Sequence, residues 1–142
     1  MVIKGAELSA GNPVVILLHG RRQTTDDMTK LINKLNLAEA TYYLPSAPGA
    51  TWYPRGFTRA LDDNKPQLNQ GLEVIDHVLQ NLLSQGVSRE RIWIMGFSQA
   101  RAWRPSSSGN LNSRWGAPFY SLVDCLVLSA RQHRLKSPCL MA

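Results

Sequence analysis

Two short runs of apolar residues constrain the fold of this chain more than any other feature of its sequence. The first covers residues 14–18 (VVILL) and the second covers residues 92–95 (IWIM), which turn-forming residues 85–88 precede. Apolar runs of this length are typical of strands that are buried on both faces of a sheet. Such strands occur in parallel sheets with helices on both sides, so the two runs predict an α/β fold.

The sequence between these runs has helical spacing in two places. Thr24 and Thr25 can cap a first helix, and residues 64–66 (NKP) place a proline at an early position of a second one. Residues 42–44 (YYL), which a proline follows, predict a strand between the two helices. The apolar positions at helical spacing are Met28, Leu31, Ile32 and Leu35, then Leu68, Leu72, Ile75, Leu79 and Leu82. We therefore expect strands and helices to alternate, with functional residues at the carboxyl ends of the strands.

The second apolar run leads into Gly96-Phe97-Ser98-Gln99, which matches most of a nucleophile elbow. In the strand–turn–helix pattern Gly-x-Ser-x-Gly, the serine hydroxyl is exposed above a parallel sheet, and the glycines keep side chains out of a crowded turn. Ala100 stands where the second glycine belongs. Because a buried strand directly precedes this turn, we favour the elbow over an incidental Gly-x-Ser turn.

Composition limits the class of protein. The 142 residues suffice for one domain, and no N-terminal apolar stretch reaches the length of a signal peptide or membrane span, so we expect a cytoplasmic protein. Cys125 and Cys139 lack the spacing of metal ligands, and neither a metal nor a cofactor is predicted. Residues 1–99 carry ten Lys/Arg and nine Asp/Glu, whereas residues 100–142 carry six and one. The near balance over the first 99 residues argues against nucleic acid as a partner.

Five segments resemble one enzyme family in order and spacing. They are LLHGR (17–21), PSAPGATWYP (45–54), DDNKPQL (62–68), GVSRERI (86–92) and GFSQ (96–99). They resemble the phospholipase/carboxylesterase branch of the α/β-hydrolase fold, the family that includes acyl-protein thioesterases. The resemblance implies an α/β-hydrolase-like parallel sheet flanked by helices, in which residues 1–99 form the N-terminal part of the domain. The C-terminal part is then expected to be incomplete or irregular.

The resemblance also implies roles for individual residues. Ser98 matches the nucleophile that forms an acyl-enzyme with an ester or thioester. The backbone N–H groups of Arg21 and Gln99 match the two donors of the oxyanion hole. Trp52 matches an aromatic position beside the substrate pocket, although loop packing explains a tryptophan there equally well. The residues matched to structural positions at the site are His19, Gly20 and Gly96, and the place of His19 under the oxyanion turn favours this role over that of a catalytic base.

One residue of the oxyanion turn departs from the family pattern. Arg22 stands where the family has a glycine. Because a side chain restricts the backbone there, we expect Arg22 to distort the oxyanion loop.

Residues 100–142 resemble nothing in the family, and the composition changes where the elbow needs its helix. Permitted codons for residues 100–108 (ARAWRPSSS), read with one G added in front, also encode GACLAAEFV, which restores the glycine and a helix. The same shift over residues 120–129 can give LLSGGLLGPE, which resembles the family's next strand and its Ser-Gly-Gly turn. We therefore interpret residues 100–142 as an atypical basic tail that is frame-shifted. The rival interpretation is a genuine, divergent C-terminus.

The function predicted from these features is that of a serine hydrolase acting on carboxylic esters or thioesters. Asp124 and His133 follow Ser98 in the Ser…Asp…His order of the fold, but the tail lacks the alternating elements that would place them. The catalytic Asp and His are therefore expected to be absent from these 142 residues. The alternative is a catalytically inactive fragment, and a tail that binds nucleic acid is a minor third option. The sequence predicts neither the acyl chain, the leaving group nor the oligomeric state.

Overall fold

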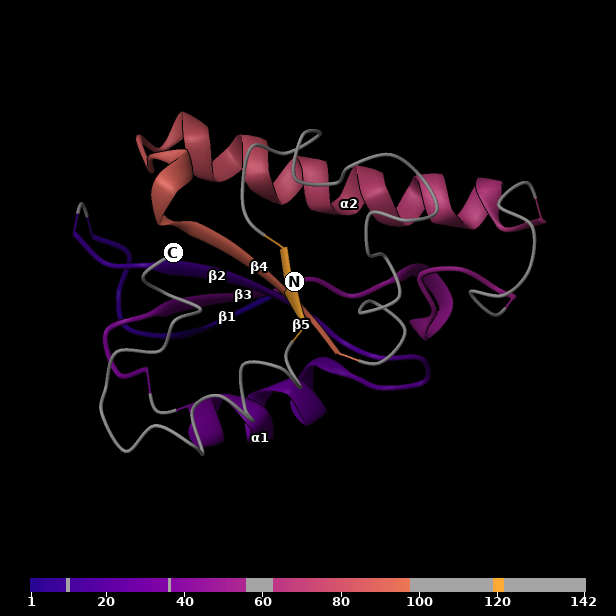
Figure 1. The fold of residues 1–142 in the computed structure, drawn as a ribbon, viewed down its shortest axis with the longest axis horizontal. Helices are drawn as coiled ribbons and strands as arrows, with labels where there is room; N and C mark the ends of the chain where they lie inside the picture. The colour runs from indigo at the N-terminus through magenta and orange to yellow at the C-terminus, as the bar shows by residue number, and fades with distance from the viewer. Residues whose placement is uncertain (10, 36, 56–62, 98–118, 122–142) are drawn as a thin grey trace.

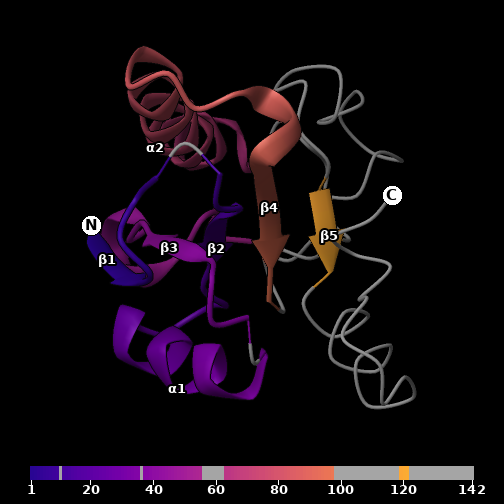
Figure 2. The same cartoon turned by 90° about the vertical axis from the view of Figure 1, so that its left-hand side faces the viewer.

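One mixed sheet with a helix on each face forms the body of the molecule. The structure, a computed structural model, describes residues 1–9, 11–35, 37–55 and 63–97 and the backbone of residues 119–121. The sheet has the strand order β1-β3-β2-β4-β5. Its strands are β1 (Val2–Gly5), β2 (Val14–Leu18), β3 (Thr41–Leu44), β4 (Ile92–Gly96) and β5 (Phe119–Ser121). Helix α1 (Thr25–Leu35) and helix α2 (Lys65–Ser84) lie on opposite sides of this sheet (Figure 1), and Figure 2 shows the three layers from a second direction.

The central strand β2 holds both helices because its side chains alternate between the two faces of the sheet. All five of its residues are buried. Val14, Ile16 and Leu18 belong to the core cluster that contains the buried face of α2. Val15 and Leu17 belong to the cluster that contains Met28 and Leu35 of α1. An apolar run without polar interruptions is therefore what a strand between two helical layers requires.

Four of the five strands run in parallel. β2 pairs with β3 and with β4, and β5 pairs with β4, all in parallel register. Leu18 at the end of β2 lies opposite Gly96 at the end of β4. Beyond that pair, the backbone N–H of Phe97 donates to the carbonyl of Leu18 at 3.1 Å. The turns that follow β2 and β4 are consequently neighbours at one edge of the sheet.

The strands and helices expected between residues 14 and 95 are confirmed. The strand at residues 14–18 has the bounds that were predicted, and both helices begin next to their predicted caps, at Thr25 and Lys65. Strand β1 was not predicted. It pairs antiparallel with β3 at the sheet edge, so the sheet is parallel in four strands and antiparallel in the fifth. No helix in the described ranges is long and apolar enough to cross a bilayer.

Candidate active site

The turn after β2 is fixed from below by His19. This side chain is 1% exposed. Its Nε2 accepts a hydrogen bond from the backbone N–H of Ala47 at 3.0 Å. The ring proton therefore lies on Nδ1, which donates to the carbonyl of Gly20 at 2.7 Å. Both ring nitrogens are occupied, so His19 has no lone pair available for the proton of a serine hydroxyl.

Residues 20–23 form a turn in which the backbone N–H of Arg21 is the one without a partner among the described residues. The N–H of Gly20 donates to Oε1 of Gln23 at 2.8 Å, and the N–H of Gln23 donates to the carbonyl of Gly20 at 3.2 Å. The N–H of Arg22 donates to the carbonyl of Ala50 at 3.0 Å. Among the described residues, the N–H of Arg21 has no acceptor. The turn therefore offers one donor to a group outside it, at the position matched to the oxyanion hole.

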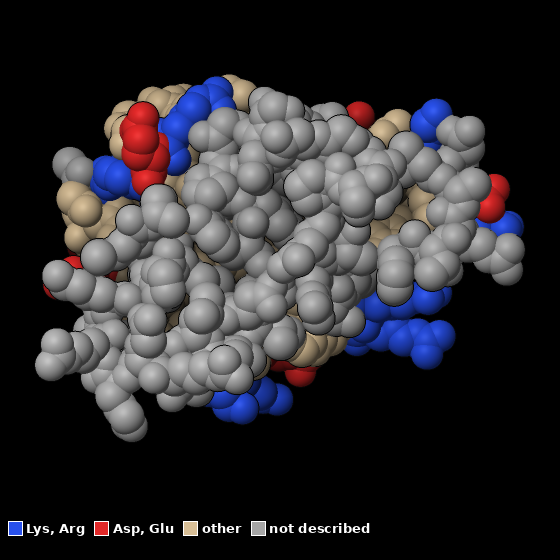
Figure 3. Space-filling model, in the orientation of Figure 1, with Lys and Arg blue, Asp and Glu red and all other residues tan. Residues whose placement is uncertain are grey.

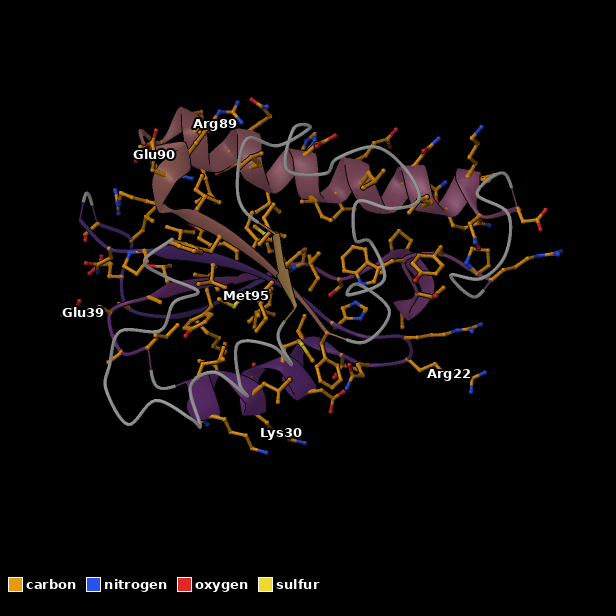
Figure 4. The ribbon with its side chains drawn as sticks, viewed as in Figure 1. Arg22, Lys30, Glu39, Arg89, Glu90 and Met95 are labelled. Carbon is orange, nitrogen blue, oxygen red and sulfur yellow. The ribbon has the colours of Figure 1, made fainter. Side chains whose placement is uncertain are left out.

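Arg22 keeps this turn in a conformation that glycine would adopt more easily. Its φ is 60°, in the left-handed region that side chains disfavour. The expected distortion of the oxyanion loop stays a prediction, and the N–H of Arg22 is bonded to the carbonyl of Ala50. The side chain itself is exposed and extends outward at the right-hand end of the molecule in Figure 4.

Trp52 lies directly against the histidine below the turn. Its indole N–H donates to the carbonyl of His19 at 2.8 Å, and the two ring centroids are 5.0 Å apart. Trp52 is fully buried and belongs to the core cluster on the α2 face. These contacts explain how the loop after β3 supports the turn after β2. The predicted place of Trp52 beside a substrate pocket stays a prediction.

The side chain of Arg21 connects the turn after β2 to the loop after β3. The Nη2 of Arg21 donates to the carbonyl of Pro54 at 2.9 Å, which joins the turn to the loop by a side-chain contact as well. Burial raises the pKa of Tyr53 to about 12, and the positive charge of Arg21 opposes that rise. The neighbouring Arg55 is held through its backbone N–H, which donates to Oδ1 of the buried Asn64 at 2.8 Å.

The remaining predicted site residues are placed only in part. Gly96 is the buried last residue of β4, at the strand end where the elbow is expected. Ser98 and Gln99 lie outside the described residues, as do Asp124 and His133. The roles predicted for Ser98, Gln99 and Arg21 therefore stay predictions.

The described residues also include a pocket away from this turn, and the grouping of their His, Cys, Asp and Glu residues bears on metal binding. The described part of the chain contains no group of three or more His, Cys, Asp or Glu residues that could hold a metal ion. A pocket of about 380 Å³ is lined by Leu8, Ser9, Gln85, Gly86, Val87 and Arg91. These residues precede β2 and β4, so the pocket lies at the amino ends of the strands. Figure 4 shows Arg89 and Glu90 at that end and Arg22 at the other.

Several contacts of the turn, among them those of Gln23, Ala47 and Ala50, were missed by reasoning from the sequence. Gln23 closes the turn through its side chain, whereas Ala47 and Ala50 act through backbone groups. A glutamine three residues after a glycine is a local signal for the first contact. No sequence signal indicates the other two, because a backbone N–H or carbonyl is present at almost every residue.

Comparison with known proteins finds matches among solved structures. No family model matches the chain, and no curated protein matches it. Among solved structures, the chain is similar to a phospholipase/carboxylesterase from Dyadobacter fermentans DSM 18053, with a TM-score of 0.66 and 32% sequence identity. The match covers 70% of this chain and 48% of that one, so the chain spans about half the length of that protein. Likeness in both fold and sequence shows that the chain belongs to the phospholipase/carboxylesterase family of the α/β-hydrolase fold.

Proposed function

We propose that this chain is a serine hydrolase that acts on small carboxylic esters or thioesters through an acyl-enzyme on Ser98. The observation that carries the proposal is the backbone N–H of Arg21. Its neighbours in the turn are bonded, and it has no acceptor among the described residues. A preorganised N–H of this kind stabilises the negative charge that develops on a carbonyl oxygen during acyl transfer.

The proposed reaction uses the roles that the family resemblance implies for Ser98, Gln99 and Arg21. Ser98 Oγ attacks the carbonyl carbon, and the resulting oxyanion accepts hydrogen bonds from the N–H groups of Arg21 and Gln99. The bond to the leaving alkoxide or thiolate then breaks, which leaves the acyl group on Ser98. Water attacks this acyl-enzyme, the carboxylic acid is released and the serine hydroxyl is restored. The serine proton needs a base in each cycle.

An inactive hydrolase fragment is the second candidate, and the described histidines favour it. Both ring nitrogens of His19 are occupied, and His77 is exposed on α2. We therefore assign neither histidine as the base that accepts the proton of Ser98. If residues 100–142 are a frame-shifted tail, the Asp and His of the family are missing from the 142 residues, and Ser98 would acylate slowly without turning over.

Detection of the acyl-enzyme tests the nucleophile without requiring turnover. The chain is incubated with an activated short-chain aryl ester, and the peptide that contains Ser98 is examined by mass spectrometry. We expect one acyl group on Ser98 and none in the Ser98→Ala variant. Ser84→Ala is the matched control, because Ser84 is an exposed serine at the end of α2, and this variant should acylate like the parent chain. Equal labelling of the parent and Ser98→Ala would overturn the proposal.

A further inference from the structure

We propose that the ester substrates of this site carry an anionic group, a carboxylate or a phosphate, which the guanidinium groups of Arg21 and Arg22 bind. The inference rests on the proposed function, because it places the anion beside the turn that would hold the ester carbonyl. The inference starts from Arg21 and Arg22, two consecutive arginines in that turn.

The guanidinium of Arg21 is positioned rather than loosely exposed. Its Nη2 bonds the carbonyl of Pro54 at 2.9 Å, which holds the group between the turn and the loop after β3. The remaining N–H donors form a planar fork that matches the two oxygens of a carboxylate or phosphate. The backbone N–H of the same residue has no acceptor among the described residues. One residue can therefore face the ester carbonyl with its backbone and an anion with its side chain.

Arg22 supplies an independent observation. Its backbone conformation is unfavourable, and its side chain forms no hydrogen bond with the described residues that would stabilise the fold. Left-handed backbone is unfavourable for a residue with a side chain, and glycine adopts it without this penalty. The exposed Arg22 side chain makes no hydrogen bond to any described residue. Strained residues of this kind gather at functional sites. A role in binding explains why an arginine occupies a position that suits glycine.

Charge around the turn favours an anion as the ligand. Arg55, next to Pro54, adds a third exposed guanidinium group on the loop that Arg21 contacts. Figure 3 shows a group of Lys and Arg atoms at the lower right, where Figure 4 places Arg22, and some Asp or Glu atoms higher on the same edge.

The nearest carboxylates in sequence do not neutralise these arginines. Asp26 and Asp27 follow the turn, in the first turn of α1. Asp27 accepts hydrogen bonds from the backbone N–H of Thr24 at 2.9 Å and from its hydroxyl at 3.1 Å, which lower the pKa of that carboxyl. Within the described ranges, no carboxylate pairs with Arg21, Arg22 or Arg55. Among the described residues, no carboxylate therefore competes with an anion for these guanidinium groups.

Binding rather than turnover tests this inference, so that it can be judged even if the chain is inactive. Dissociation constants are measured by NMR titration of the 142-residue chain at low salt with three methyl esters. One ends in a carboxylate (monomethyl glutarate), one in a phosphonate (methyl phosphonoacetate) and one in a methyl group (methyl pentanoate). We expect at least one anionic ester to bind about tenfold more tightly than the neutral one, with added salt reducing the difference. The tighter of the two anionic esters identifies the preferred anion.

Two variants with the same change in net charge locate the effect. Arg22→Asn keeps a residue that tolerates left-handed backbone, and Lys30→Asn removes an exposed cation from α1. We expect Arg22→Asn to weaken binding of the preferred anionic ester about tenfold and to leave the neutral ester unchanged, whereas Lys30→Asn changes neither. Equal binding of all three esters, or equal losses in both variants, would overturn the inference. Absence of an acyl group on Ser98 would instead overturn the proposed function, whatever the titrations show.

Discussion

Gly5 is a residue at which the backbone leaves almost no room for a side chain. Its φ is 83°, and an added β-carbon would lie 2.3 Å from the carbonyl oxygen of Ala40 and 2.9 Å from Cδ2 of Tyr42. We expect Gly5→Ala to lower the free energy of unfolding by about 1–3 kcal/mol, measured by urea denaturation. Gly11→Ala is the control, because nothing lies within 4 Å of a β-carbon there. Equal losses in the two variants would contradict the close approach of β1 to β3.

The hydroxyl of Tyr42 is buried and has no hydrogen-bond partner among the described residues. Burial raises its pKa from 10.0 to about 12. As the pH rises through this interval, the unfolded chain loses the phenol proton before the folded chain does, so stability falls as pH rises. Below about pH 10 both states are protonated and this loss is absent. We expect Tyr42→Phe to unfold at about the same urea concentration as the parent at neutral pH and to lose less stability above pH 10. Parallel alkaline losses in both proteins would show that Tyr42 does not titrate in this way.

Hydrogen bonds between Thr24 and Asp27 cap the start of helix α1. The N–H of Thr24 donates to Oδ2 of Asp27 at 2.9 Å, and the N–H of Asp27 donates to the Thr24 hydroxyl at 3.4 Å. This reciprocal cap satisfies two N–H groups at the start of the helix. We expect Thr24→Ala to cost about 1 kcal/mol of stability, measured as a lower Tm. Thr29→Ala serves as the control, since its hydroxyl bonds only the carbonyl of Thr25 within the helix. An equal or larger loss in Thr29→Ala would argue against the cap.

At the scale of elements, a strand could be predicted when its burial produces a recognisable pattern of apolar residues. Strand β1 has no such pattern and was not predicted. β2 and β4 are buried on both faces, so each is an apolar run. β1 is short and mostly exposed at the sheet edge, and Ile3 is 54% exposed. Its four residues VIKG show neither an apolar run nor a clear alternation, so pairing with β3 is visible only in three dimensions.

The site was predictable in outline for a related reason. The His-Gly turn and the strand that ends at Gly96 could be recognised because their residue types are specific. The contacts that fix the turn come from Ala47, Ala50 and Pro54, which the fold brings back to the turn from far along the chain. Such partners depend on topology and on backbone groups, so the sequence does not reveal them.

Over the whole molecule, we interpret residues 1–99 as the N-terminal part of a hydrolase domain and residues 100–142 as a frame-shifted tail. Strand β5 pairs with β4 at the position of the next strand of the sheet, and only its backbone is described. A frame-shifted tail predicts that the nucleotide sequence, with one base restored before codon 100, reads on as a family member. Alignment of the tail with related genes in its present frame would contradict the frame shift.

The most direct test of the central claim compares ester turnover by three proteins on one short-chain aryl ester. They are this chain, its Ser98→Ala variant, and the product of a gene with one base restored before codon 100. A serine without its base and acid typically loses on the order of 10⁴- to 10⁶-fold in turnover. We predict rapid hydrolysis by the restored protein alone, with Ser98-dependent acylation but little turnover in the 142-residue chain. Hydrolysis by this chain that depends on Ser98 and approaches the restored protein's rate would show that residues 1–142 contain a working base.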